Sequence, residues 1–378
     1  MDRRTFLSAS SALLSCASLP AWAAPASPRL LILIELRGGN DALNTVIPIE
    51  DGAYFDLRPR LALKPDAVAR FAGAPALHPS LAPLESLWRD GQMAILQGVG
   101  YPSPNLSHFR SIEIWDTASD SQQFLQTGWL TRTVDKQSAF AASSADGVVI
   151  GAADLGPLAG GARAVALNDP ARFARQARLA SADGVSARGA LAHVLRVESD
   201  IVRAGADVRP DVSFKTEFPR GVFGITVQHA AGIAATGKVT VLRLTLSGFD
   251  THQNQSAIHA NLLRVVAESV VALRAALSEH GAWERTLILT YSEFGRRPRE
   301  NQSGGTDHGT AGALFAFGPQ VRGGVHGTAP SLRALDDAGN LRHTTDFRRV
   351  YAAVLEHWWH LPSERVLQRR FDPLRFIS

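Results

Sequence analysis

Residues 29–41 read RLLILIELRGGND and join an apolar run of strand length to a glycine-rich polar ending. Apolar residues fill most of positions 29–36, so this run predicts a buried first strand. Gly38 and Gly39 follow at once with Asn40 and Asp41, which predicts a tight polar loop at the end of the strand.

Further apolar runs of strand length occupy residues 93–98, 238–246, 285–291 and 311–317. Between the runs at 238–246 and 285–291, residues 256–279 carry apolar side chains at helical spacing. Strand, helix, strand is the pattern of a parallel sheet covered by helices. The sequence therefore predicts an α/β fold with a mostly parallel central sheet flanked by helices, closed by an amphipathic helix over 346–359.

The stretch from about 135 to 223 differs from the rest because it is rich in Ala, Gly, Ser and Arg and has only short apolar runs. We interpret it as an inserted, mainly helical cap. Residues 24–378 are then one large domain that carries this insertion.

The first 23 residues have the features of a twin-arginine export signal. Arg3 and Arg4 precede Phe6 and a mildly apolar run, and the small residues Ala21 and Ala23 predict cleavage after Ala23. The run is too short for a permanent membrane anchor, and no other segment approaches the length of a membrane span. We therefore expect a periplasmic or secreted protein.

Cys16 is the only cysteine, and it lies inside this expected signal. Cleavage after Ala23 would leave a mature chain without disulfides, thiol catalysis or thiolate metal ligands. Residues 13–16 resemble a lipoprotein box, but Leu14 is bulkier than such a box prefers, which disfavours anchoring at Cys16.

The formal charge of +4 comes from scattered arginines and not from a dense basic run. Nucleic-acid binding is therefore not indicated, whereas weak attraction to anionic substrates or surfaces is compatible with this charge.

Ligands of open α/β sheets bind outside the carboxyl ends of the strands. At the expected strand ends the chain carries amide, hydroxyl, carboxylate, imidazole and guanidinium groups: Asn40, Asp41, Asn44, Asn105, Ser107, His108, Asp250, His252, Ser292, Glu293, Arg296, Asp307 and His308. Oxygen and nitrogen donors of this kind indicate a metal site.

Single motifs in this set have simpler explanations. Asp41 in a Gly-Gly-Asn-Asp loop is commonly a turn or cap residue, and Ser107 suits the N-cap of a helix that continues through Trp115. Asp250 with His252, and Asp307 with His308, are harder to explain structurally, because each pairs a carboxylate with a nearby imidazole.

The chain also resembles the domain of unknown function 1501 family over nearly its whole mature length. The resemblance rests on LRGGNDALNT at 36–45, Tyr54 with Arg58-Pro59, LHP at 77–79, NLSHF at 105–109, TGWL at 127–130, SEFGR at 292–296, TDHG at 306–309 and TDFR at 345–348. That family looks like a branch of the alkaline phosphatase superfamily, whose phosphatases, sulfatases and phosphomutases use two metal ions. The resemblance implies an alkaline-phosphatase-like sandwich.

The resemblance also implies roles for individual residues. Ser107 looks like the nucleophile, with Arg110 or Arg296 steadying the substrate oxygens. The implied substrate contacts are Asn40, Asn44, Asn105 and His108. The implied ligands of one or two divalent ions (zinc, calcium, magnesium or manganese) are Asp41, Asp250, His252, Glu293, Asp307 and His308.

Three departures from the superfamily pattern stand out, one of which is that Asp250 and His252 lie closer together in the sequence than the usual Asp and His pair. Phe294 occupies a position where an imidazole ligand is expected, which places the second metal in question. Phe109 follows Ser107 by two positions, so the signature for making formylglycine is absent, which disfavours a sulfuric ester hydrolase.

Three hypotheses follow for the function. The first is a metal-dependent hydrolase of phosphate-type esters. The second is a catalytically inactive envelope protein that binds a partner protein or a polysaccharide. The third is a serine hydrolase, disfavoured because no Gly-x-Ser-x-Gly elbow is present.

Overall fold

The computed structural model describes residues 28–134, 145–167 and 212–378. The expected export signal with Cys16, and most of the expected cap, lie outside these residues. No helix in the described part of the chain is both long enough and apolar enough to cross a bilayer.

A nine-stranded sheet forms the centre of the fold, in the order β10-β4-β9-β8-β1-β7-β5-β6, with β11 paired to β4. Strand β1 (Leu30–Arg37) lies between β7 (Val239–Ser247) and β8 (Thr286–Tyr291) and is parallel to both. The other strands are β4 (Met93–Gly100), β5 (Ala145–Ile150), β6 (Ala164–Leu167), β9 (Gly312–Phe317), β10 (Gly324–Gly327) and β11 (Thr345–Asp346). The predicted α/β fold with a mostly parallel sheet is confirmed.

Strand β9 is antiparallel to both β4 and β8. The predicted strand at 311–317 is present as β9. Its antiparallel direction could not be predicted, because hydrophobic periodicity carries no information on strand direction. Outside this sheet, β2 (Val46–Ile47) and β3 (Ala76–Leu77) form a small antiparallel pair.

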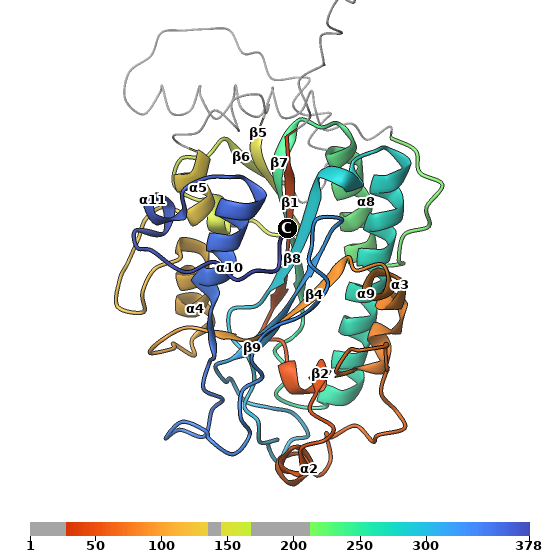
Figure 1. Ribbon diagram of the computed structural model, residues 1–378, viewed down its shortest axis with the longest axis vertical. Coiled ribbons are helices and arrows are strands. Elements are labelled where there is room, and N and C mark those ends of the chain that lie inside the picture. The colour runs from red at the N-terminus through yellow and green to blue at the C-terminus, as the bar shows by residue number, and fades with distance from the viewer. Residues whose placement is uncertain (1–27, 135–144, 168–211) are drawn as a thin grey trace, which may run out of the picture.

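Helices cover both faces of the sheet (Figure 1). One face packs against α8 (Val222–Ala235), α9 (Gln255–Glu279) and α3 (Glu85–Arg89), and the other against α4 (His108–Thr117), α5 (Trp129–Val134), α10 (Phe347–Ala353) and α11 (Ser363–Leu367). The predicted helices over 256–279 and 346–359 are present, the second continuing from α10 into a π-helical turn at Val354–Trp358.

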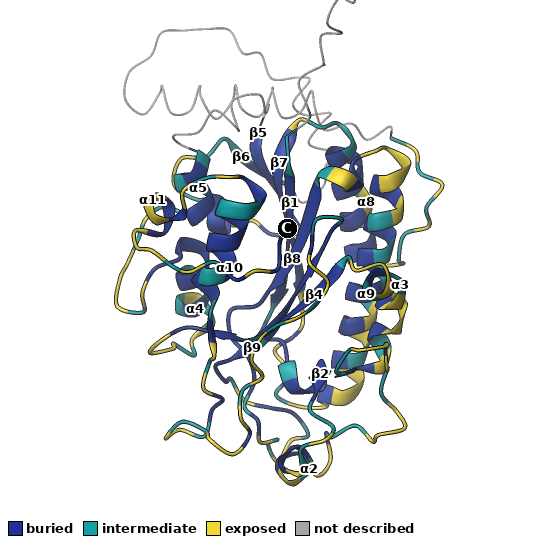
Figure 2. Ribbon diagram, viewed as in Figure 1, coloured by how far each residue is buried: buried dark blue, intermediate teal, exposed yellow. Residues whose placement is uncertain are grey.

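Alternation along β1 sends side chains to two cores. Ile32 and Ile34 join the core under α8 and α9, whereas Leu31 and Leu33 join the core under α4 and α10. Glu35 points to the second side, fully buried, and its carboxylate accepts a hydrogen bond from Arg243 on β7 at 2.9 Å. Figure 2 shows the strands buried between helices whose outer surfaces are exposed.

Residues 145–167 correct the expected cap at about 135–223. They form β5 and β6, which extend the main sheet beyond β7. Apolar runs as short as VVI and AVAL are enough for strands that pair with an existing sheet. The remaining cap residues, 135–144 and 168–211, lie outside the described chain.

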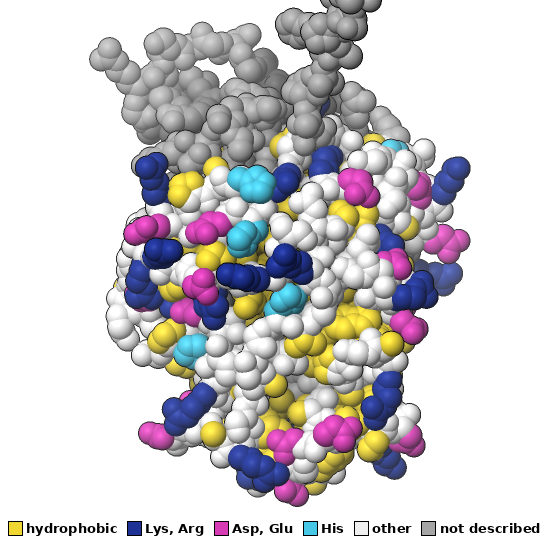
Figure 3. All heavy atoms as spheres, in the orientation of Figure 1, with side chains coloured by type: hydrophobic (Ala, Val, Ile, Leu, Met, Phe, Trp, Pro, Cys, Tyr) yellow, Lys and Arg dark blue, Asp and Glu magenta, His cyan; other side chains and the backbone are white. Residues whose placement is uncertain are grey.

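Charges of both signs are interspersed on the face seen in Figure 3, as the scattered arginines predict. Short elements α2 (Gly52–Leu57) and β2 with β3 cover the end of the sheet at which β1, β7 and β8 finish.

Candidate metal centre

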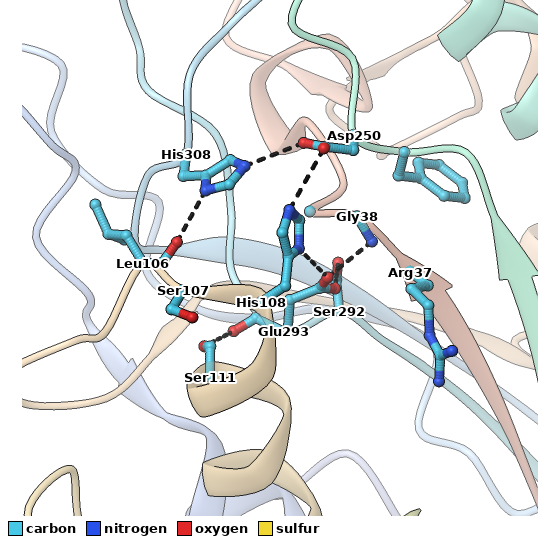
Figure 4. Close-up of polar contacts among 12 residues, drawn as sticks. Arg37, Gly38, Leu106, Ser107, His108, Ser111, Asp250, Ser292, Glu293 and His308 are labelled. Atoms are coloured by element: carbon cyan, nitrogen blue, oxygen red, sulfur yellow. Dashed lines mark hydrogen bonds and ion pairs between the residues drawn. The ribbon is translucent and has the colours of Figure 1, made fainter. Parts of the chain in front are cut away.

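The carboxyl ends of β1, β7 and β8 meet at one edge of the sheet, because these strands are parallel neighbours. The loop after β1 packs closely on the loop after β7: Gly38 has a φ of +119°, and a Cβ at this position would overlap the backbone of Asp250. The start of α4 and the loop over 303–309 complete the site (Figure 4).

Three histidines surround the carboxylate of Asp250. The Nε2 atoms of His252 and His308 each lie 3.0 Å from Asp250 Oδ1 and 3.0 Å from each other. His108 Nε2 lies 3.4 Å from Asp250 Oδ2. The site therefore brings together one carboxylate and three imidazoles from three different segments of the chain.

Each of these histidines uses its other ring nitrogen to bond an acceptor. Nδ1 donates to Glu293 Oε1 at 2.8 Å in His108, to Asp307 Oδ1 at 3.3 Å in His252, and to the carbonyl of Leu106 at 2.8 Å in His308. A neutral imidazole that donates from Nδ1 carries a lone pair on Nε2. The three lone pairs thus point toward Asp250, where they repel one another and the carboxylate unless a cation or proton lies between them.

This arrangement fits a divalent metal ion. Tetrahedral ligands at zinc-like bond lengths of about 2.0–2.1 Å lie about 3.3 Å apart, close to the 3.0 Å separations here. His108, Asp250 and His308 are partly exposed, so an ion can reach them. Acceptors behind the histidines are the usual way in which proteins orient imidazole ligands.

Arg296 fixes Asp250 from behind and is itself fully buried. Its guanidinium donates to Asp250 Oδ1 at 2.6 Å, to the carbonyls of Gly38 and Gly39, and to those of Phe249 and Thr306. Partial burial raises the pKa of Asp250, but the hydrogen bond and the positive charge of Arg296 outweigh it and lower this pKa to about 2. Asp250 is therefore an anion, and Arg296 is buried against backbone carbonyls and Asp250, contrary to the substrate-binding role implied for it.

Glu293 positions His108 instead of joining the donor atoms directly. Its carboxylate accepts from the backbone nitrogen of Gly38 at 2.8 Å as well as from His108. The hydrogen bond to Glu293 raises the pKa of His108, against the effect of partial burial. Phe294 packs its ring against His108 and His308, at centroid distances of 4.9 and 4.5 Å, and so fixes the planes of both imidazoles.

Asp41 does not belong to this cluster, which corrects the role implied by the resemblance. It is buried in an ion pair with Arg58, whose two Nη atoms donate to its carboxylate at 2.6 and 2.9 Å, and Gln255 donates to it too. Burial raises the pKa of Asp41, but the ion pair with Arg58 has the larger effect, so this pKa lies below its ordinary value. A guanidinium therefore neutralises Asp41.

The expected substrate contacts other than His108 also lie elsewhere. Asn40 and Asn44 are buried, the first bonded to His259 and Thr45, the second to Tyr54 and Arg58. Asn105 accepts from the backbone nitrogen of Ser107 at 2.9 Å and shapes the turn before α4. Arg110 is held by Glu113 and by carbonyls of residues 121 and 123, so it does not face the cluster.

Ser107 is the exposed N-cap residue of α4, and its side chain makes no capping hydrogen bond. Its chain neighbours Leu106 and His108 contact His308 and Asp250, respectively, so Ser107 lies at the border of the cluster (Figure 4). A hydroxyl at the first turn of a helix lies where backbone N–H groups favour negative charge.

Sequence reasoning missed three contributors. The carbonyl of Leu106 orients His308, Arg58 neutralises Asp41, and Asn301 donates to Asp307 at 3.2 Å and to the carbonyl of His252 at 2.9 Å. Asn301 lies in a polar loop where no pattern distinguishes it. Arg58 was part of the family motif, but no spacing rule links it to Asp41.

A cavity of about 760 Å³ opens beside the cluster and is lined by His108, Asp250 and Glu293 at one end. Asp116 of α4 also lines the cavity, and only 9% of its surface is exposed. Burial raises the pKa of Asp116 to about 8; Arg243 opposes this rise, and Glu35 and Asp154 add to it. Asp116 is therefore mainly protonated near neutral pH.

Replacing Arg58 with Met should lower the free energy of unfolding by about 3–5 kcal/mol, because it leaves the buried carboxylate of Asp41 without its cation. Urea denaturation measures this loss. Arg264→Met is the control: it breaks an exposed pair with Glu268 and should cost less than about 1 kcal/mol. If Asp41 held a metal instead, Arg58→Met would leave stability nearly unchanged.

Asp116 should make stability depend on pH. The folded chain holds its proton up to about pH 8, whereas an unfolded aspartate releases it near pH 4, so stability is full below about pH 4 and is lost as pH rises toward 8, by up to about 1.4 kcal/mol per pH unit. Urea unfolding of the unmodified protein and of Asp116→Asn across this range checks the effect. Parallel profiles for the two proteins would contradict it.

Comparison with known proteins finds one matching family model and several solved structures of low sequence identity. Similar solved structures include a phosphonate monoester hydrolase from Silicibacter pomeroyi (11% identity, TM-score 0.39, covering 79% of this chain and 69% of that one). Another is the PsFucS1 sulfatase from Pseudoalteromonas sp. (11% identity, TM-score 0.36, 93% of this chain and 74% of that one).

A third is the C-terminal periplasmic domain of EcEptC from Escherichia coli in complex with Zn (8% identity, TM-score 0.36, 77% and 73%). No curated protein sequence matches this chain. The family model described as "Protein of unknown function (DUF1501)" matches residues 93–369, which include His108, Asp250, Glu293 and His308. The chain therefore belongs to the DUF1501 family.

Proposed function

We propose that this protein is an exported, metal-dependent hydrolase of phosphate-type esters, with Ser107 as the nucleophile. The observation that carries the proposal is the convergence of three Nε2 atoms on Asp250, each histidine being oriented by an acceptor at Nδ1. Export rests on the twin-arginine pattern of residues 1–23.

The proposed ligands of a single site are His108, Asp250 and His308, whose donor atoms lie within 4.8 Å of one another, and His252 beside Asp250 and His308 is a further donor. Three imidazoles with one carboxylate suit zinc or manganese better than calcium or magnesium, which prefer oxygen donors. A second ion is not part of the proposal, because Arg58 already neutralises Asp41 and Phe294 offers no donor atom. Asp307 and Glu293 hold His252 and His108 in place.

An ion bound here would withdraw charge from a phosphoryl oxygen. Ser107 Oγ would form a bond to phosphorus as the bond to the ester oxygen breaks, and the serine proton would pass to the departing alcohol. A water oxygen would then bond to the phosphorus, the bond from phosphorus to Ser107 Oγ would break, and a proton from the water would return to Oγ as phosphate leaves. The N-terminus of α4 favours the negative charge that develops at this hydroxyl.

Phe294 supports a second candidate, a non-catalytic envelope protein that binds a protein or polysaccharide partner. It replaces the expected imidazole with a ring that packs against His108 and His308. Such a protein would keep its metal and its partner after loss of Ser107. A sulfuric ester hydrolase is disfavoured because the formylglycine signature is absent around Ser107.

Elemental analysis and ester turnover test the first candidate together. Purified protein should contain about one equivalent of zinc or manganese and hydrolyse p-nitrophenyl phosphate. His308→Ala should lose the metal, and Ser107→Ala should keep it while turnover falls about 1,000-fold or more. The control His326→Ala alters a histidine outside the cluster and should change neither. Full metal content with no turnover on any phosphate ester would favour the non-catalytic candidate.

Glu293→Gln tests the positioning of His108. Loss of the carboxylate behind a histidine ligand should weaken metal affinity about 10–100-fold while the folded state is retained. Competition with a zinc-binding dye measures the affinity, and circular dichroism checks the fold. Unchanged affinity would mean that His108 is not a ligand.

A further inference from the structure

The cavity beside the metal centre is continuous with it and has walls of its own. Its volume of about 760 Å³ is in the range of sites for organic ligands. Phe109, Ile112, Leu125 and Leu155 contribute apolar surface, and Phe109 is 89% exposed. A substrate whose ester lies at Asp250 would place its remaining, organic part in this cavity.

The charged groups of the wall are almost all acidic. Six carboxylates line the cavity (Glu35, Glu113, Asp116, Asp154, Asp250 and Glu293) together with one arginine, Arg37. Arg37 is already bonded to Glu35 at 2.9 Å and to Asp154 at 3.0 Å. Behind the wall, Arg243 pairs with the same two carboxylates. Among the described lining residues, the charge of the one arginine is therefore already matched by these two carboxylates.

Asp116 is a carboxyl group of the cavity wall that forms no ion pair with Arg37 or Arg243. It is 91% buried and lines the cavity; its Oδ1 is enclosed by the protein without a hydrogen-bond partner, so a ligand reaches this carboxyl group at its other oxygen, Oδ2. A buried acceptor without a donor is costly, and the high pKa of Asp116 reflects the same lack of a cation. A ligand that brings a donor to the accessible oxygen Oδ2 would give this carboxyl group the partner that the protein does not supply.

We propose that the cavity selects substrates whose departing group carries a positively charged nitrogen, which donates to Asp116. An ammonium is favoured over a hydroxyl because Asp116 has no cationic partner, whereas the other carboxylates of the wall are already paired with arginines or with His108. His108 and Asp116 are eight residues apart on α4, about 12 Å along the helix, so a linker of several atoms separates ester and nitrogen. The statement that this ligand is a substrate rests on the proposed function, whereas the statement that the cavity binds it does not.

Calorimetric titration of the whole protein with three probes of equal length tests the proposal: hexylammonium, 1-hexanol and hexanoate. Hexylammonium should bind at least about tenfold more tightly than hexanol, and hexanoate should bind most weakly. Asp116→Asn keeps the shape of the side chain and should abolish the preference for the amine. Glu113→Gln is the matched control, since its charge is already paired with Arg110, and should change the preference by less than about twofold.

Two results would overturn the inference: equal binding of amine and alcohol to the unmodified protein, which would indicate a hydroxyl-bearing ligand, or an amine preference that persists in Asp116→Asn. Circular dichroism confirms that the variant is folded. The titration needs no turnover, so an amine preference without ester hydrolysis would remove only the proposed function. Hydrolysis of p-nitrophenyl phosphate without an amine preference would remove only this inference.

Discussion

The site depends on the hydrogen bonds that the buried guanidinium of Arg296 donates. It donates to carbonyls of the loop after β1, of the loop after β7 and of the loop over 303–309, and to the carboxylate of Asp250. Three segments that are far apart in sequence are thereby fixed relative to one another. Without this cation, a carboxylate and several carbonyl dipoles would face one another in a space from which water is largely excluded.

Orientation, and not composition alone, gives the histidines their chemical character. Glu293, Asp307 and the carbonyl of Leu106 each accept from an Nδ1 atom, so the three Nε2 atoms converge on Asp250. Phe294 adds a steric restraint by packing on two of the rings. Phe294, which departs from the superfamily pattern, thus helps to hold His108 and His308 in place.

Paired charges also divide the site into regions with different chemistry. Arg58 cancels the charge of Asp41 beneath the cluster, and Arg37 with Arg243 cancels that of Glu35 and Asp154 in the cavity. Asp250 keeps its charge beside three imidazoles, and Asp116 stays unpaired. These two carboxyl groups are where a ligand has most to gain.

The sequence alone determined the strand runs at 29–36, 93–98, 238–246 and 285–291, the helix over 256–279, and the gathering of Asp250, His252 and His308 at one edge. Local periodicity and the rule for parallel strand ends are sufficient for this. Only the tertiary structure decided the direction of β9, the place of residues 145–167 in the sheet, and the separate roles of Asp41, Glu293 and His108. Those depend on which partner lies within about 3 Å of a charged or polar atom, and such partners come from distant parts of the chain.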